Sequence, residues 1–190
     1  RGGGRSSGRE TCARVAAGAF AKMLLKEQGI SICAYTKEAA GIKCSKTDES
    51  QIEKNLMRAP DSDAAAIMQK RIEELKKEGD SAGGIIECVI RGVPAGLGEP
   101  VFDKIDAVLA HAMLSIGAVK GIEFGAGFEA AELTGSENND SMKKDAVFAS
   151  NNAGGILGGI SRGDEIIFRV AVKPVPSIYR EQKTVDTSMS

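Results

Sequence analysis

Apolar residues recur every three or four positions over a long stretch near the start of the chain. Ser7 and Glu10 have the spacing of a capping box, and the apolar series behind them continues up to Gly29. The series consists of Cys12, Val15, Ala16, Ala19, Phe20, Met23 and Leu24. This pattern predicts a long amphipathic helix whose apolar side needs a covering layer.

The same spacing predicts two further helices. One runs from about Asp63 to Glu78 and stops at Gly79. The other has Pro100 in its first turn and ends at Gly117. Its buried stripe consists of Phe102, Ile105, Leu109, Ala112 and Ile116. His111 falls off that stripe.

Short alternating stretches predict strands between these helices. They cover Ile30 to Tyr35, Ile85 to Ile90, Val119 to Phe124, Glu129 to Leu133 and Glu165 to Val172. The helices exceed the usual crossover length, and the strands alternate instead of forming the continuous apolar runs of a parallel sheet. We therefore expect an α+β fold, with long helices layered against antiparallel sheets, in a single domain over residues 1–190.

The composition narrows the classes of function. With 25 Lys and Arg against 26 Asp and Glu, the net charge of -1 lacks the basic surplus of a nucleic-acid or anionic-membrane binder. No apolar run approaches the ~20 residues of a membrane span. The four cysteines are widely spaced without a CxxC pair, and His111 is the only histidine. These features argue against a metal site, a disulfide framework and a Ser-His-Asp triad.

The segment RGGGRSS, residues 1–7, stands immediately before the first predicted helix. Free amides and the positive dipole end of a helix attract an anion, and Arg5 adds a fork of donors that suits phosphate. The hydroxyls of Ser6 and Ser7 add further donors. The alternative is a capped helix start with solvent-exposed arginines. Three consecutive glycines favour the ligand, because a plain cap does not need them.

Two more segments have a composition that is compatible with ligand binding. Residues 151–159, with the sequence NNAGGILGG, suit a ligand lined by backbone amides or a simple tight turn, and they lack the Lys and Ser/Thr of a P-loop. Residues 173–177, with the sequence KPVPS, form a rigid turn with one ammonium and one hydroxyl, which suits a phosphate or merely ends a strand. The residues alone leave both alternatives open in each segment.

Several motifs together resemble the chorismate synthase family. They are RGGGRSSGRET, ARVAAGAFAK, DSAGGIIECVIRGVPAGLGEPVFDKIDAVLAHAMLSIGAVKGIEFGAGF, GSENND, NNAGGILGGIS and FRVAVKPVPSI, in this order from Arg1 to about Asp186. The family eliminates phosphate from 5-enolpyruvylshikimate 3-phosphate in a 1,4-anti reaction that gives chorismate. This lyase step belongs to the shikimate pathway of aromatic amino acid biosynthesis. It requires reduced FMN, although it has no net redox change.

The resemblance implies a fold, a cofactor and a set of site residues. The fold is a β-α-β sandwich of long helices and antiparallel sheets, and the full-length enzyme is a cytoplasmic homotetramer linked to NADP. The residues implied to bind FMN are Arg5, Ser6, Ser7, Gly117, Ala118, Gly158, Lys173, Pro174, Val175, Pro176 and Ser177. Arg5 is also implied to contact the phosphorylated substrate. The resemblance implies no metal, membrane or nucleic acid.

The chain departs from the family pattern most at its ends. The family's FGESHG and RPGHAD segments would precede Arg1, and its GRHDP segment would follow Ser190. We therefore expect a truncated central portion that holds part of the flavin site, contains no catalytic residue and is inactive alone. Smaller departures are Gly8 and Cys12 in place of alanine and Val175 in place of threonine. A flavin- or anion-binding module without turnover and a non-binding assembly core are the alternatives.

Overall fold

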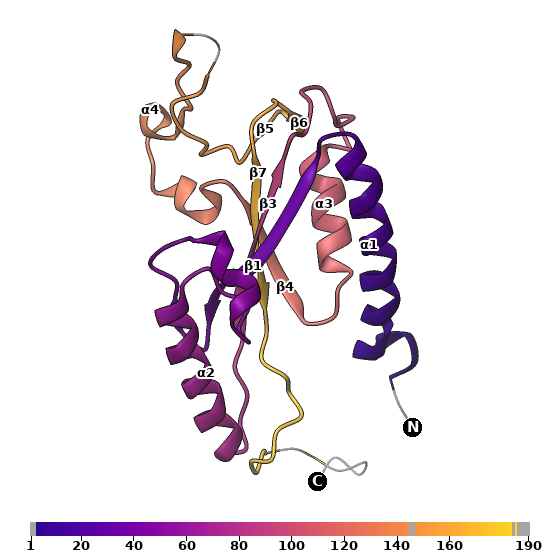
Figure 1. Cartoon of the computed structure of the whole chain (residues 1–190), viewed down its shortest axis with the longest axis vertical. Helices are drawn as coiled ribbons and strands as arrows, with labels where there is room; N and C mark the ends of the chain where they lie inside the picture. The colour runs from indigo at the N-terminus through magenta and orange to yellow at the C-terminus, as the bar shows by residue number, and fades with distance from the viewer. Residues whose placement is uncertain (1–2, 145–146, 184, 186–190) are drawn as a thin grey trace. The chain divides into compact units, whose positions relative to one another are not determined.

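The computed structural model describes residues 3–144, 147–183 and 185 (Figure 1). The chain divides into two compact units. The first consists of Arg1–Tyr35 and Ile85–Val172, and the second of Thr36–Gly84 and Lys173–Ser190. Strands β1 (Ser31–Ala39) and β3 (Gly84–Arg91) have residues in both units. The single domain over residues 1–190 stays a prediction.

The first unit is built on four neighbouring strands in the order β1-β3-β7-β4. Strands β4 (Val119–Phe124) and β7 (Ile166–Val172) are antiparallel, with Val119 opposite Val172 and Phe124 opposite Phe168. A separate antiparallel hairpin consists of β5 (Ile156–Leu157) and β6 (Ile160–Ser161). The expected combination of helices with antiparallel strands, an α+β fold, is confirmed.

Two longer helices accompany this sheet, α1 (Thr11–Glu27) and α3 (Ile105–Leu114). Alternation along β7 buries Ile166, Phe168 and Val170 on one face of the sheet. Side chains of α3 pack on the same cluster, namely Ile105, Leu109 and Met113. Figure 1 shows α3 beside the strands of this unit and α1 next to α3. The core of the unit therefore lies between α3 and the sheet.

Helix α1 confirms the predicted element but not its predicted start. Ser7 accepts a hydrogen bond from the Arg9 amide at 3.4 Å and so caps the short helix η2 (Gly8–Glu10), which follows another short helix, η1 (Gly4–Ser6). Glu10 binds Arg14 instead of completing a capping box with Ser7. No residue of α1 is buried, and Phe20 is 71% exposed. The apolar side of α1 is therefore uncovered in this chain.

The second unit centres on helix α2 (Ser62–Lys77), close to the predicted bounds. Ala64, Ala65 and Met68 of α2 pack with residues of the preceding segments, which include Ile42 of β2 (Ile42–Lys43). A short helix, η3 (Glu49–Lys54), stands between β2 and α2 in the chain. Asp61 caps α2 by accepting hydrogen bonds from the amides of Asp63 and Ala64. The bond from Ala64, together with hydrogen bonds from Ser45 and the Lys46 amide, outweighs desolvation and lowers the pKa of Asp61 to about 2.

The third helix begins later and ends earlier than the spacing predicted. It starts at Ile105, because Glu99 and Asp103 exchange two backbone hydrogen bonds of 2.8 and 3.0 Å that close a turn ahead of it. That turn excludes Pro100 from the helix and leaves Phe102 89% exposed. Phe102 is therefore not part of the buried stripe. The helix ends at Leu114, three residues before Gly117.

The predicted strand from Glu129 to Leu133 is wrong, because the short helix η4 (Gly127–Ala131) occupies this position. Gly125 and Gly127 have φ angles of 55° and 59°, which turn the chain after β4. The Phe128 amide then donates to the Glu123 carboxylate at 3.1 Å and holds the turn. A four-residue helix, α4 (Gly135–Asn138), follows.

Candidate functional site

The amino-terminal segment presents a free cation. Arg5 is exposed, and its guanidinium has neither a hydrogen bond nor an ion pair with any residue that the structure describes. The amides of Ser6 and Ser7 donate to Gly3 and Gly4 carbonyls at 2.8 and 3.1 Å. These two amides are therefore not available to an anion, contrary to the expected free helix start. Anion binding at this segment would instead depend on the Arg5 side chain and the serine hydroxyls.

Arg14 connects this segment to the end of α3. It lies in the first turns of α1, and its Nη1 donates to Ser115 Oγ at 2.8 Å. Its Nη2 donates to the Ser115 carbonyl at 3.4 Å. Ser115 is the C-cap of α3 and is followed two residues later by Gly117 and Ala118. The structure thereby brings residues 5–7 and residues 117–118 to the same end of the α1 and α3 pair (Figure 1).

The backbone at Ala118 has an uncommon conformation. Its φ angle of 73° lies in the left-handed region, which costs a residue with a Cβ roughly 1–2 kcal/mol. Such strain is concentrated at functional sites, where the surrounding structure enforces it. Gly117 has no atom within 4 Å of the position where a Cβ would stand. The two residues therefore present an open, sterically accessible backbone surface.

Gly158 lies at the opposite end of α3. It occupies the β5–β6 turn with a φ angle of 60°, and a Cβ there would meet nothing within 4 Å. The neighbouring Gly159 accepts a hydrogen bond from the Ile105 amide at 2.8 Å, which docks the turn at the first residue of α3. A ten-residue helix separates its ends by about 15 Å. Gly158 is therefore not adjacent to Ala118 within this unit.

Two glycines of residues 151–159 serve a tight turn. A Cβ on Gly154 would stand 2.4 Å from the Gly125 amide nitrogen, and one on Gly155 would stand 2.4 Å from the Glu165 carbonyl oxygen. Their lack of a side chain is needed for backbone packing. For Gly154 and Gly155 the tight-turn alternative is correct, whereas the open side of Gly158 still permits a ligand.

A buried ion pair fixes this glycine-rich loop. Asp140 and Arg162 have side chains 3% and 6% exposed and are joined at 2.7 Å. The Asp140 carboxylate also accepts hydrogen bonds from Ser150 Oγ and the amides of Asn152 and Ala153. Burial raises the pKa of Asp140, but these bonds and the one from Arg162 outweigh it and lower the pKa to about 2. Sequence analysis missed the pair because neither residue lies in the glycine motif.

Residues 173–177 belong to the second unit. Lys173 is half-buried, and in the described part of the chain its ammonium has no hydrogen-bond or ion-pair partner. The rest of the turn is exposed, and Ser81 Oγ donates to the Val175 carbonyl at 2.7 Å. The turn therefore has a defined backbone contact and an unpaired ammonium.

A row of charged side chains crosses the sheet of the first unit. Arg169 on β7 donates to Glu123 on β4 at 2.6 Å and to the Gly125 carbonyl at 2.7 Å, and it approaches Glu87 on β3 at 3.4 Å. Tyr35 on β1 donates to Glu87 at 2.5 Å. Because the arginine already has these protein partners, we assign the row a structural role that ties the four strands together.

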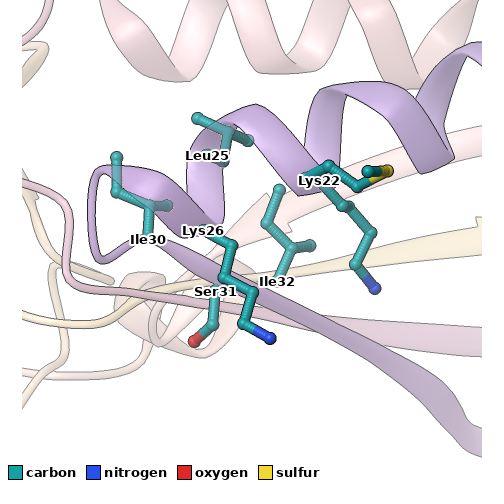
Figure 2. A pocket seen from close by; sticks show the side chains of 7 residues that line it. Lys22, Leu25, Lys26, Ile30, Ser31 and Ile32 are labelled. Carbon is teal, nitrogen blue, oxygen red and sulfur yellow. The ribbon is translucent and has the colours of Figure 1, made fainter.

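The cavity in Figure 2 lies away from the candidate site. It has a volume of about 290 Å³ and is lined by Lys22, Met23, Leu25, Lys26, Ile30, Ser31 and Ile32. Lys22 and Lys26 stand one turn apart on α1, and Ile30 begins the segment that enters β1. The cavity is at the carboxyl end of a 17-residue helix, about 25 Å from the end that follows residues 5–7. It therefore does not form part of the Arg5 site.

Metal ligation and membrane insertion are the two other classes of feature that bear on residues 3–144, 147–183 and 185. These residues contain no group of three or more His, Cys, Asp or Glu side chains placed to hold a metal ion. They also include no helix with the length and apolar character needed to cross a membrane.

Comparison with known proteins decides the family. The sequence model of the family described as chorismate synthase matches residues 1–190. The chain belongs to the chorismate synthase family. It is similar to a chorismate synthase of Syntrophobacter fumaroxidans, with 57% identity over 187 residues, which cover 98% of this chain and 53% of that protein. A chorismate synthase of Methanosarcina mazei is 55% identical over 193 residues, covering 98% and 53%.

The fold agrees with this family assignment. A solved crystal structure of a chorismate synthase has a TM-score of 0.83 and 36% identity to this chain, and the match covers 90% of this chain and 57% of that one. The chain spans about half the length of the curated relatives that it matches. The chorismate synthase resemblance of the sequence motifs is thereby confirmed, together with the fold.

Proposed function

We propose that this chain is part of an FMN-dependent lyase that eliminates phosphate from 5-enolpyruvylshikimate 3-phosphate to give chorismate. The observation that carries the proposal is the family match over residues 1–190. It is supported by the unpaired Arg5 guanidinium ahead of α1, the helix whose Arg14 donates to Ser115 at the end of α3. An unpaired guanidinium with two adjacent hydroxyls has the donors that a phosphate group requires.

The described residues fit a flavin phosphate and ring. Arg5 has no competing protein partner in the described structure, and the open space above Gly117 leaves room for a flat group. Reduced FMN, when bound, would supply an electron-rich ring next to the substrate, in a reaction without net redox change. The residues of this chain would bind and orient the anionic groups.

Proton transfer is not assigned to this chain. His111 is exposed in the last turn of α3, and in the described structure its imidazole has no hydrogen-bond or ion-pair partner. We propose no catalytic residue among residues 1–190 and expect them to be inactive alone. The homotetramer, the link to NADP and the cytoplasmic location stay predictions.

An anaerobic assay of the gene product that carries these 190 residues tests the proposal. Purified protein is mixed with 5-enolpyruvylshikimate 3-phosphate and reduced FMN, and phosphate and chorismate are measured together. We expect both products in equal amounts, with no product when oxidised FMN is kept oxidised. Tight FMN binding without either product would instead favour a flavin-binding module without turnover.

A further inference from the structure

We propose that Arg14 is a positioning residue that holds the Arg5–Ser7 segment in register with the Gly117–Ala118 loop. This inference rests on the proposed function, because both segments belong to the proposed anion and flavin site and Arg14 bonds to a neighbour of each, Glu10 and Ser115. Arg14 itself is not proposed to touch a ligand, since its donors are occupied by protein groups.

Arg14 binds two separate parts of the first unit, Glu10 before α1 and Ser115 at the end of α3. Its Nε lies 2.9 and 2.8 Å from the two carboxylate oxygens of Glu10, three residues after Ser7. Its Nη1 and Nη2 donate to the hydroxyl and the carbonyl of Ser115. A planar guanidinium can serve both sides at once, whereas a lysine ammonium on one flexible stem cannot reproduce this fork.

The Ser115 side of the contact is itself fixed. Ser115 Oγ donates to the Ala112 carbonyl at 2.6 Å, and its backbone amide donates to the His111 carbonyl at 3.2 Å. The cationic guanidinium therefore binds at the carboxyl end of α3, where unpaired carbonyls and the helix dipole favour positive charge. Ile116 then accepts a hydrogen bond from the Val119 amide at 3.3 Å, which spans the strained Ala118.

The exposure of the Arg14–Glu10 ion pair distinguishes a positioning role of Arg14 from a stabilising one. The Arg14 and Glu10 side chains are 40% and 38% exposed, so their ion pair contributes little to the free energy of unfolding. A loss of Arg14 should therefore leave the fold intact. It should instead allow the start of α1 and the end of α3 to move relative to each other.

The test compares Arg14→Ala, Arg14→Lys and Ser115→Ala in the gene product that carries these residues. Backbone hydrogen exchange is measured without ligand, and the Kd for FMN is measured by titration. We expect faster exchange in residues 115–119, an FMN Kd raised about tenfold, and a Tm within about 2 °C of the parent. Arg14→Lys should behave like Arg14→Ala, and the Arg14→Ala and Ser115→Ala double variant should be no worse than Arg14→Ala alone.

Arg71→Ala is the matched control, because Arg71 is a comparably exposed arginine paired with Glu74 on α2. It should change neither exchange nor affinity. Unchanged exchange in residues 115–119 of Arg14→Ala, or a Tm loss that accounts for the whole effect, would overturn the positioning role. If Arg14→Ala shows faster exchange in residues 115–119 but the parent binds no FMN, the positioning role of Arg14 is retained and the proposed function is rejected.

Discussion

Charged residues of this chain differ in whether the protein already satisfies them. Asp140 accepts hydrogen bonds from several groups inside the fold, while Arg5 has none within the described structure. A satisfied buried charge stabilises one conformation, and an unsatisfied exposed charge next to a strained loop is available to a ligand. The role of Arg5 could be predicted because the glycines and serines that indicate an anion site are its neighbours in the sequence. The partner of Asp140 could not be predicted, since Arg162 meets it only after the loop folds back.

Arg5→Ala should weaken ligand binding without unfolding the protein. A charge-assisted hydrogen bond contributes ~1.5–3 kcal/mol, so FMN or substrate affinity should fall by about one to two decades. Isothermal titration of the gene product with FMN and with substrate measures this. Arg71→Ala is the control for removing an exposed arginine, and His111→Ala should change binding and turnover by no more than a few-fold. Parent-like binding of both ligands by Arg5→Ala would mean that residues 1–7 form only a structural cap.

Asp140→Asn should destabilise the first unit strongly. The substitution weakens the buried hydrogen bonds to the Asp140 charge, although Arg162 keeps Asp164 at 2.8 Å, so the free energy of unfolding should fall by about 1.5–3 kcal/mol. Urea unfolding at pH 7 measures the difference, and Glu132→Gln, at an exposed position, should be nearly neutral. An effect of Asp140→Asn as small as that of Glu132→Gln would show that the loop does not depend on this pair.

The pH dependence of stability follows from the same carboxylate. The folded pKa of Asp140, about 2, is below its ordinary value of 3.8, so its contribution is present above pH 4. The contribution should be lost as the pH falls from about 4 through 2. The difference in the free energy of unfolding between the parent and Asp140→Asn is measured by urea unfolding at a series of pH values. It should shrink as the pH falls through this window and stay constant above it.

Among the elements, those determined by local spacing were predictable and those determined by distant contacts were not. Helices α1 and α2 and strand β7 follow their sequence periodicity closely. Phe102 was misplaced because the Glu99–Asp103 turn, which gives no periodic signal, delays the start of the helix to Ile105. In the same way, the Phe128 amide donates to the Glu123 carboxylate, and this contact holds the turn that places η4 where a strand was expected. Periodicity also cannot say which layer covers the apolar side of α1.

The uncovered side of α1 should make these 190 residues associate. Phe20, Met23 and Leu24 are 71%, 66% and 66% exposed and lie within one and a half turns of each other. Contiguous apolar surface of this kind favours association. Light scattering across a concentration series should show particles larger than a monomer, and Phe20→Lys combined with Leu24→Lys should reduce them. Leu56→Lys, which removes an isolated exposed leucine of the second unit, should have no such effect.

At the scale of the whole molecule, the family and its fold were predictable because several ordered motifs cover nearly the entire chain. The site was predictable only in part. Residues 5–7 precede α1 and residues 117–118 follow α3 at the end where Arg14 binds Ser115, whereas Gly158 lies at the other end of α3 and residues 173–177 belong to the second unit. Motif order carries no information on these separations, because they depend on helix length and strand pairing.

The final prediction is that residues 1–190 alone form no chorismate. Each general acid or base contributes ~10²–10⁴-fold to such a rate, and we assign neither role within this chain. The Glu10 carboxylate is bound by Arg14. The measurement is phosphate release from 5-enolpyruvylshikimate 3-phosphate with reduced FMN, on a sample whose circular dichroism verifies the helices. A His111→Ala variant is run in parallel. Turnover that disappears in His111→Ala would contradict the prediction and would assign the proton transfer to that exposed imidazole at the end of α3.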